Sequence, residues 1–504
     1  MLLAEVVAVS AGVTATSSRK SKITQLASLL SRLKNDEIPI AVGFLSGEVR
    51  QGRIGVGYAS AFGIEVAPAV DAILTLSEVD DVLAAIPNVT GSGSQSRRAT
   101  MLEGLFARAT APEQEFLRRL LTGELRQGAL EGIMVEAVAS AFGVAPVALR
   151  RALMLQADLG VVAGVASVTG EAGLAEVGLE VLSPLMPMLA SPVGSIEEAV
   201  TGPVLVEWKL DGARIQVHRK GSEVRVFTRN LNDITERLPE VVTVVLELAE
   251  DTLVLDGEAM ALRPDGTPQP FQETMSRFGT EERAFAEAPL FPFFFDVLHL
   301  GGEDLIDRPL HERLVRLDDV VPRERRIPRL STADPAEATR FLDEAVAARQ
   351  EGVMVKDRDS LYEAGRRGKA WRKVKPVYTY DLVVLGVEWG HGRREGYLSN
   401  IHMGARDPRT GEYVMVGKTF KGMTDEMLTW QTTRFLDLEV SRDRWAVYVR
   451  PEQVVEVAID GVQASSRYPG GIALRFARVK RYRDDKAPEE ADTIDTLKSL
   501  LQGS

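Results

Sequence analysis

The stretch "LVEWKLDGARIQVHRKG", Leu205 to Gly221, places Lys209 inside a run that otherwise alternates like a β-strand. An unpaired ammonium is costly to bury, so this lysine is either solvated at the end of the strand or chemically active. A nucleophilic lysine must lose its proton, and at a reference pKa of about 10.4 only about one molecule in two thousand is neutral at pH 7. Partial burial beside Trp208 and nearby cations such as Arg214 and Lys375 would lower that pKa. The sequence therefore predicts Lys209 as a nucleophile.

Polar clusters interrupt further strand-like segments downstream of Lys209. A single charged residue at such a place is usually only a solvated strand end, and a lone Lys-x-Asp-Gly match carries little weight. The number of clusters and their order along the chain indicate one shared site. The clusters are Arg229 in "FTRN", Glu258 in "LDGE", Phe295 and Asp296 in "PFFFD", Glu351 to Lys356 in "EGVMVK", Lys373 and Lys375 in "WRKVK", and Arg483, Asp485 and Lys486 in "RYRDDK".

This succession resembles the covalent nucleotidyltransferase superfamily, which comprises DNA ligases, RNA ligases and mRNA capping enzymes. In that superfamily the motif lysine attacks the α-phosphate of a nucleotide and forms a phosphoramide. The resemblance implies that Lys209 carries the nucleotide. It also implies that Glu207 accepts a hydrogen bond from the adenine amino group, which favours ATP over GTP. Phe295 stacks on the purine in this interpretation, although core packing explains the aromatic run equally well.

The same resemblance implies a metal site. Glu258 is expected to contact the ribose or the metal, and Glu351 is expected to contact the metal. Carboxylates together with water and phosphate oxygens are the ligands that Mg²⁺ requires. The alternative for each residue is an ordinary exposed strand end. We therefore expect ATP and Mg²⁺ as the cofactors.

Phosphate binding must rely on local charge. A triphosphate brings about four negative charges, whereas 60 basic and 72 acidic residues give this chain a net charge of −12. Arginine can grip phosphate or ribose oxygens with a bidentate fork. Arg372 stands where the superfamily usually has an apolar residue, which leaves open whether the lysine before or after Val374 contacts phosphate. The candidate cations, each of which could instead be a solvated surface residue, are Arg214, Arg229, Arg367, Lys373 and Lys375.

The 504 residues exceed one hydrophobic core of about 250 to 300 residues, so two or three domains are expected. Residues 1–190 carry apolar side chains at helical spacing and predict an all-helical domain. The Pro-, Gly- and Ser-rich stretch Ser183 to Pro203 predicts a linker. Alternating strands and helices predict an α+β domain over residues 193–376, and several short strands predict an OB-fold β-barrel over residues 377–504.

Individual elements are also predictable. "ARIQVHRKGSEVRVFT" predicts a hairpin that turns at Lys220 and Gly221. "DPAEATRFLDEAVAARQ" predicts a helix with Asp334 as N-cap and Pro335 at its first position. The N-terminal stretch "MLLAEVVAVSAGV" contains Glu5, lacks a basic leader and is too short to span a bilayer. We expect it to form the first packed helix of a cytoplasmic protein.

The N-terminal half distinguishes between members of the superfamily. "LTGELRQGALEGIMVEAVASAFGV" resembles the helical DNA-binding domain of three-domain ATP-dependent DNA ligases, the archaeal and eukaryal type also found in some bacteria. Capping enzymes lack such a domain. The absence of cysteine argues against the NAD-dependent ligases, whose zinc module needs four. The leading interpretation is an ATP-dependent DNA ligase. The alternatives are an RNA ligase or GTP-dependent capping-type enzyme, and a non-catalytic DNA-binding scaffold.

The implied reaction has three phosphoryl transfers: adenylylation of Lys209, transfer of AMP to a 5′-phosphate, and attack by a 3′-hydroxyl. The expected partner is nicked double-stranded DNA, contacted mainly through its backbone. We expect a monomer without membrane contact, and no glutamine-led motif with paired aromatics indicates binding to a sliding clamp. The residues expected to orient pyrophosphate are Arg483, Asp485 and Lys486, and the minor-groove candidates are Arg126, Gly128 and Ala129.

Overall fold

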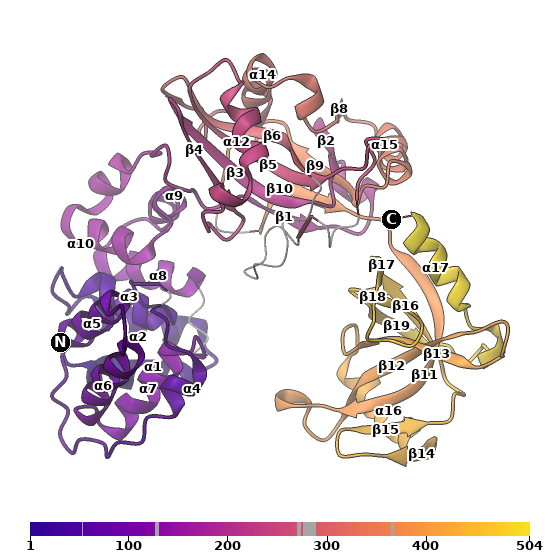
Figure 1. The fold of residues 1–504 in the computed structure, drawn as a ribbon, viewed down its shortest axis with the longest axis horizontal. Helices are drawn as coiled ribbons and strands as arrows, with labels where there is room; N and C mark the ends of the chain where they lie inside the picture. Colours follow the sequence, from indigo (N-terminus) through magenta and orange to yellow (C-terminus); the bar gives the residue numbers. More distant parts are fainter. Residues whose placement is uncertain (53, 126–130, 270–273, 276–288, 364–366, 504) are drawn as a thin grey trace.

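The computed structural model describes residues 1–52, 54–125, 131–269, 274–275, 289–363 and 367–503. Three parts follow one another along an open arc (Figure 1): a helical N-terminal part, a central part with two sheets and flanking helices, and a strand-rich C-terminal part. This order agrees with the three predicted domains. Among the described helices, none is both long enough and apolar enough to cross a membrane.

The N-terminal part is built from helices around one apolar core. α1 contributes Leu3, Val6 and Val13 to that core, which agrees with the predicted packed first helix. Some of the helices begin at capping residues that satisfy free backbone N–H groups; for example, the Ser18 hydroxyl accepts from Ser21 N at the start of α2. The helices are α1 (Leu3–Ala15), α2 (Arg19–Leu30), α3 (Ile38–Ser46), α4 (Tyr58–Phe62), α5 (Leu76–Ala85), α6 (Ser94–Ala107), α7 (Ala111–Leu121), α8 (Glu131–Phe142), α9 (Pro146–Gln156) and α10 (Leu159–Glu176).

The central part contains two five-stranded sheets with the orders β1-β10-β9-β2-β8 and β4-β3-β5-β6-β7. Helices cover the outer face of each sheet: α11 and α15 pack on the first, and α12 and α14 pack on the second. A third apolar cluster lies between the inner faces. The strands are β1 (Leu189–Pro192), β2 (Val204–Lys209), β3 (Ala213–Lys220), β4 (Glu223–Thr228), β5 (Thr252–Ala261), β6 (Leu290–Leu300), β7 (Glu303–Asp304), β8 (Arg329–Thr332), β9 (Gly352–Asp357) and β10 (Arg367–Val374), and the helices are α11 (Ile196–Ala199), α12 (Pro239–Leu246), α14 (Leu310–Val320) and α15 (Pro335–Ala347).

Two predicted elements of this part are confirmed. β3 and β4 form an antiparallel hairpin in which Lys220 pairs with Glu223, and Gly221 adopts a φ of 62° at the turn. α15 begins at Pro335, and the Asp334 side chain accepts a hydrogen bond from Ala336 N. Both elements are encoded locally, by a glycine that allows a left-handed turn and by a capping carboxylate.

The linker prediction for Ser183 to Pro203 is wrong in part. This segment contains β1, which pairs in parallel with β10, and α11, which packs against α15. Leu185 and Met188 are buried between the two sheets. The proline and glycine content signals irregular backbone, but the apolar side chains of the segment have a core to enter and the backbone is held by the sheet.

In the C-terminal part the predicted barrel does not close. The described strands form an open sheet with the order β13-β12-β11-β15-β14, and β16 bridges β11 to β19. β11 is long enough to pair with β16 through its first half and with β15 through its second half. The separate β17-β18 hairpin contacts β13 without joining this sheet. The elements are β11 (Tyr378–Trp389), β12 (Leu398–Arg406), β13 (Tyr413–Thr419), α16 (Asp425–Asp437), β14 (Glu439–Arg442), β15 (Ala446–Val449), β16 (Val454–Ile459), β17 (Gly461–Ala464), β18 (Ile472–Arg475), β19 (Arg478–Tyr482) and α17 (Ile494–Gly503).

Candidate active site

A cleft of about 800 Å³ opens between the inner faces of the two central sheets. Strand alternation brings the predicted residues to it. On β2, Val204 and Val206 face the core under α15, so Glu207 and Lys209 face the cleft. The predicted residues that line the cleft are Glu207, Lys209, Arg214, Arg229, Glu258, Phe295, Glu351, Lys373 and Lys375.

Glycines allow the strand ends to approach each other closely around Lys209. A Cβ atom at Gly212, in the Lys-x-Asp-Gly motif, would lie 2.6 Å from the Ala259 carbonyl oxygen. Gly352, directly after Glu351, has a φ of 140°, and a Cβ there would lie 2.3 Å from the Val374 carbonyl oxygen. Both motifs therefore need glycine to bring their functional side chains together.

The Lys209 ammonium forms an ion pair with Glu351, which also accepts from Lys375. Burial lowers the pKa of Lys209, but the carboxylates of Glu351, Glu258 and Asp211 outweigh burial and raise that pKa above its ordinary value. The prediction of a lowered Lys209 pKa is therefore wrong for this structure. The expected cations do not act on the amine, because Lys375 is engaged by Glu351 and Arg214 is engaged elsewhere.

Glu258 faces Lys209 from β5. Burial raises the pKa of its carboxyl to about 7, although Lys209 and Arg214 oppose the shift. Glu351 behaves in the opposite way: burial raises its pKa, but Lys209 and Lys375 together hold the pKa below its ordinary value. The two carboxylates beside the nucleophile thus differ in proton affinity because only Glu351 is directly paired.

The raised pKa of Glu258 predicts a pH-dependent stability. Between pH 4.5 and about 7 the folded protein holds a proton on Glu258 that the unfolded chain has lost, so stability falls as pH rises through this window. Each pKa unit corresponds to about 1.4 kcal/mol, so the effect is on the order of 3 kcal/mol. Urea unfolding at pH 5 and at pH 8 measures this effect. The free energy of unfolding of Glu258→Gln, relative to that of the unmodified protein, should be higher at pH 8 than at pH 5. Glu236→Gln, at an exposed position, serves as the control; parallel behaviour of all three proteins would contradict the prediction.

Arg214 is less available to a ligand than the sequence suggests. Its guanidinium donates to both oxygens of Asp256 at 3.0 and 2.6 Å, to the Met188 carbonyl at 2.6 Å and to the Tyr362 hydroxyl at 3.3 Å. The group also lies 5.5 Å from the centre of the Phe295 ring. Arg214 therefore ties β3 to β5 and to the segment before β1, although it also lines the cleft.

The position of Phe295 shows core packing and is compatible with the predicted stacking on a purine. It is buried, and its ring meets Trp371 edge-on at 6.0 Å, which is core packing. It also lines the cleft. Trp371, Lys356 and Arg475 line the cleft as well, although the sequence analysis did not select them as site residues. Lys356 lies in the motif "EGVMVK", two residues after Met354, and therefore on the same face of its strand. Trp371 lies in the motif "WRKVK", two residues before Lys373, and shares a strand face with that lysine.

The side chain of Arg372 does not line the cleft. Its guanidinium donates to the Lys369 carbonyl at 2.8 Å and also contacts Ala199 and Thr201. Lys373 and Lys375 both line the cleft, so both remain candidates for the phosphate contact. The side chain of Arg367 and the three minor-groove candidates Arg126, Gly128 and Ala129 lie outside the described residues.

The "RYRDDK" residues lie outside the cleft lining, in the C-terminal part. Arg483 pairs with Asp381 at 3.1 Å and with Asp485 at 2.7 Å, and Lys486 pairs with Asp381 at 2.6 Å. The C-terminal part instead presents Arg475 and its neighbour Phe476 to the cleft. Arg475 Nη1 lies 3.2 Å from Asp211 Oδ2, two residues after the nucleophile.

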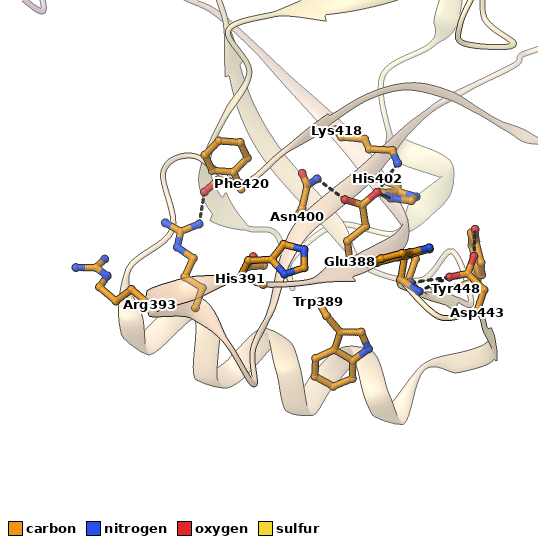
Figure 2. Close-up of a pocket in the computed structure, with 15 residues that line it drawn as sticks. Glu388, Trp389, His391, Arg393, Asn400, His402, Lys418, Phe420, Asp443 and Tyr448 are labelled. Carbon is orange, nitrogen blue, oxygen red and sulfur yellow. Dashed lines mark hydrogen bonds and ion pairs between the residues drawn. The ribbon is translucent and has the colours of Figure 1, made fainter. Parts of the chain in front are cut away.

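A second hollow of about 940 Å³ lies in the C-terminal part (Figure 2). Its centre is Glu388, which accepts hydrogen bonds from Asn400 at 2.6 Å, from His402 at 3.0 Å and from Lys418. Burial lowers the pKa of His402, against the effect of Glu388. Glu388 is thus satisfied by its neighbours, whereas Asn400 Oδ1 is buried without a hydrogen-bond partner among the described residues.

The oxygen donors in the cleft bear on the expected Mg²⁺ site. In the described part of the chain, no three side chains of His, Asp or Glu come together as a preformed metal site. Glu258 and Glu351 supply hard oxygen donors on either side of Lys209. Such a pair fits Mg²⁺ only when phosphate oxygens and waters complete the coordination, which is the usual manner of Mg²⁺ binding at nucleotide sites.

The fold and the cleft define a multidomain protein with a partly buried lysine, Lys209, in the lining of its central cleft. Three family models match successive segments: "DNA ligase N terminus" at residues 65–139, "ATP dependent DNA ligase domain" at residues 187–375 and "ATP dependent DNA ligase C terminal region" at residues 394–486. The chain is 55% identical to a "Probable DNA ligase" of Saccharopolyspora erythraea, over 99% of this chain and 98% of that protein. It is 54% identical to a protein of the same name from Mycolicibacterium gilvum, over 100% and 99% of the two chains.

Among solved structures, "Pmar-Lig_PreS3" aligns with 95% of this chain and 99% of its own, with a TM-score of 0.60 and 19% identity. This likeness supports the fold. The full-length relatives decide the family, and the chain belongs to the ATP-dependent DNA ligases. The resemblance drawn from the motifs is thereby confirmed, and the alternatives of a capping-type enzyme and an RNA ligase are not supported.

Proposed function

We propose that this ligase seals nicks in duplex DNA with ATP, through a lysyl-AMP intermediate on Lys209. The observation that carries the proposal is the position of this amine: it lies in a cleft that is also lined by aromatic side chains, Phe295 and Trp371, and by cationic side chains, Lys373 and Lys375. A nucleotide needs an apolar surface for its base and positive charge for its phosphates. The cleft supplies both, with a nucleophile in its lining.

In the proposed first step the lysine ammonium gives up its proton to solvent, the Lys209 nitrogen bonds to the α-phosphorus, and the bond from that phosphorus to pyrophosphate breaks. Because Lys209 is paired with Glu351, the amine becomes reactive only when that carboxylate is drawn to another partner. Mg²⁺, when bound, would neutralise phosphate charge, with Glu258 and Glu351 as its protein ligands. Lys373 and Lys375 would orient the phosphates, since positioning and charge neutralisation dominate such transfers.

The test combines adduct formation and sealing. Purified protein with ATP and Mg²⁺ should gain one adenylate on Lys209, located by mass spectrometry, and should seal a nicked duplex. GTP should give far less adduct than ATP. A protein that binds the nick but neither takes up AMP nor seals would support the scaffold alternative and overturn the proposal.

We infer that DNA is bound through local basic patches, because the net charge of −12 disfavours a polyanion. The segment "SRYPGGIALRFARVKRYRDDK" carries seven basic and two acidic residues. The lining of the second hollow adds exposed cations and aromatics, among them Arg393, Phe420 and Trp445. We expect the enzyme to act in the cytoplasm as a monomer, and contact with a sliding clamp would need a motif other than the glutamine-led one.

Arg393 gives a quantitative test of this DNA surface. Its side chain is 83% exposed and only loosely paired with Asp425 at 3.8 Å. Each lost phosphate contact lowers the slope of log K against log salt concentration by about 0.9. Arg393→Ala should therefore reduce the salt slope of nicked-DNA binding by about one, measured by fluorescence anisotropy. Arg323→Ala, on an exposed turn of the central part, should leave the slope unchanged; equal slopes for both variants would exclude a phosphate contact at Arg393.

A further inference from the structure

One charged pair in the cleft is buried almost completely. Lys356 on β9 and Glu207 on β2 have side chains that are 1% and 3% exposed, and Lys356 Nζ lies 2.5 Å from Glu207 Oε2. Both residues line the cleft. The strands fix this arrangement, because Lys356 stands opposite Leu205 on β2 and opposite Trp371 on β10.

The Lys356 ammonium also touches two aromatic rings. Its Nζ lies 4.4 Å from the centre of the Phe295 ring and 4.3 Å from that of Trp371. These distances are within the range of a cation–π interaction. One lysine thus contacts the carboxylate and both aromatic walls at the end of the cleft that would receive the base.

Stability alone does not account for such a pair. Removing two charges from water costs several kcal/mol per ion, and apolar residues of similar volume often serve a core equally well. Lys356 is also not needed as a further cation for phosphate, because Lys373 and Lys375 line the same cleft. What the pair does provide is a carboxylate held in one orientation on the wall of the cleft.

We propose that Lys356 is a positioning residue that selects adenine: it fixes Glu207 as a hydrogen-bond acceptor and holds the Phe295 and Trp371 rings around the base. This inference rests on the proposed use of ATP. An ionised carboxylate only accepts hydrogen bonds. It therefore matches the amino group of adenine and opposes the carbonyl oxygen that guanine carries at the same position. Sites built on such buried polar complementarity reject the mismatched ligand strongly, because a buried group is left unpaired.

Lys356 is the group that keeps Glu207 an acceptor. Burial is the largest effect and, together with Asp296, leaves the pKa of Glu207 above its ordinary value, while Lys356 and, more weakly, Arg329 limit that rise. Without Lys356 the carboxyl gains a proton more readily, and its protonated oxygen can then donate to a guanine carbonyl. Loss of the lysine should therefore weaken the selection of the base more than it weakens the chemical step.

The test is Lys356→Met, which keeps an unbranched side chain of similar length and removes its charge. The rate of lysyl-nucleotide formation is measured with ATP and with GTP over a range of concentrations. We expect KM for ATP to rise at least tenfold with a smaller change in kcat, and the ratio of kcat/KM for ATP over GTP to fall at least tenfold. Lys356→Arg, which retains the charge, should preserve most of the ATP preference. Lys369→Met, at an exposed position of the neighbouring strand, should behave as the unmodified protein.

A second variant protects the test against misfolding. Glu207→Gln/Lys356→Met leaves no buried charge of this pair and should fold, with the same loss of preference for ATP. Unchanged ATP preference in either variant would overturn the inference, as would an equal loss of activity with both nucleotides. Failure of the unmodified protein to form any lysyl-AMP would instead refute the proposed function.

Discussion

Replacing Lys209 with alanine is expected to abolish adenylate uptake and nick sealing, with a loss of at least about 10⁴-fold in rate. Removing a covalent nucleophile leaves no other group to form the phosphorus–nitrogen bond, and single removals of this kind cost enzymes several orders of magnitude. Transfer of label from α-labelled ATP to protein measures the first step. Sealing of a DNA that already carries a 5′-adenylate measures the last step, which should be reduced much less because it needs no new bond to Lys209.

Lys220 provides the matched control. It is an exposed lysine at the end of the next strand, beside the hairpin glycine. Lys220→Ala should take up adenylate at the normal rate. Residual adduct in Lys209→Ala, or an adduct mapped to another residue, would contradict the assignment of the nucleophile.

Asp296→Ala is expected to lower the free energy of unfolding by about 3–5 kcal/mol. Asp296 accepts two hydrogen bonds of 2.8 Å from Arg313, and neither side chain is exposed to solvent. Breaking a buried pair leaves an uncompensated charge, which accounts for the size of the effect. Urea unfolding followed by tryptophan fluorescence measures the change.

Two further variants test whether the loss of stability comes from the buried pair of Asp296 and Arg313. Glu5→Ala removes a surface partner of Arg32 and should cost less than about 1 kcal/mol. Asp296→Leu/Arg313→Met replaces both charges with apolar groups and should recover most of the stability lost in Asp296→Ala. If Asp296→Ala were no more destabilising than Glu5→Ala, the buried pair would not hold β6 to α14 as inferred.

Locally encoded features were predictable from the sequence. The hairpin around Gly221 and the cap at Asp334 depend on neighbours within a few residues. Strand alternation similarly indicates that Glu207 and Lys209 share one face. The order of the motifs then led to nine residues that line the cleft, because each motif ends or crosses a strand of the central sheets.

Features that depend on distant contacts were not predictable. Pairing of β1 with β10 joins segments far apart in the chain, so a Pro-rich stretch resembled a free linker. Arg214 looked like a ligand-binding cation until Asp256 and Tyr362 were seen to engage it. The sign of the Lys209 pKa shift depended on Glu351 and Glu258, which approach from two other strands.

The salt bridge between Arg475 and Asp211 shows which side of the C-terminal part faces the catalytic lysine. Arg483 and Lys486 belong to the same part but are occupied by Asp381, away from that entrance. The resemblance implies that these residues orient pyrophosphate, and for that role the C-terminal part would have to reorient toward the cleft. Only Lys375 to Val377 separate β10 from β11, so such a reorientation would have to occur within this short connection.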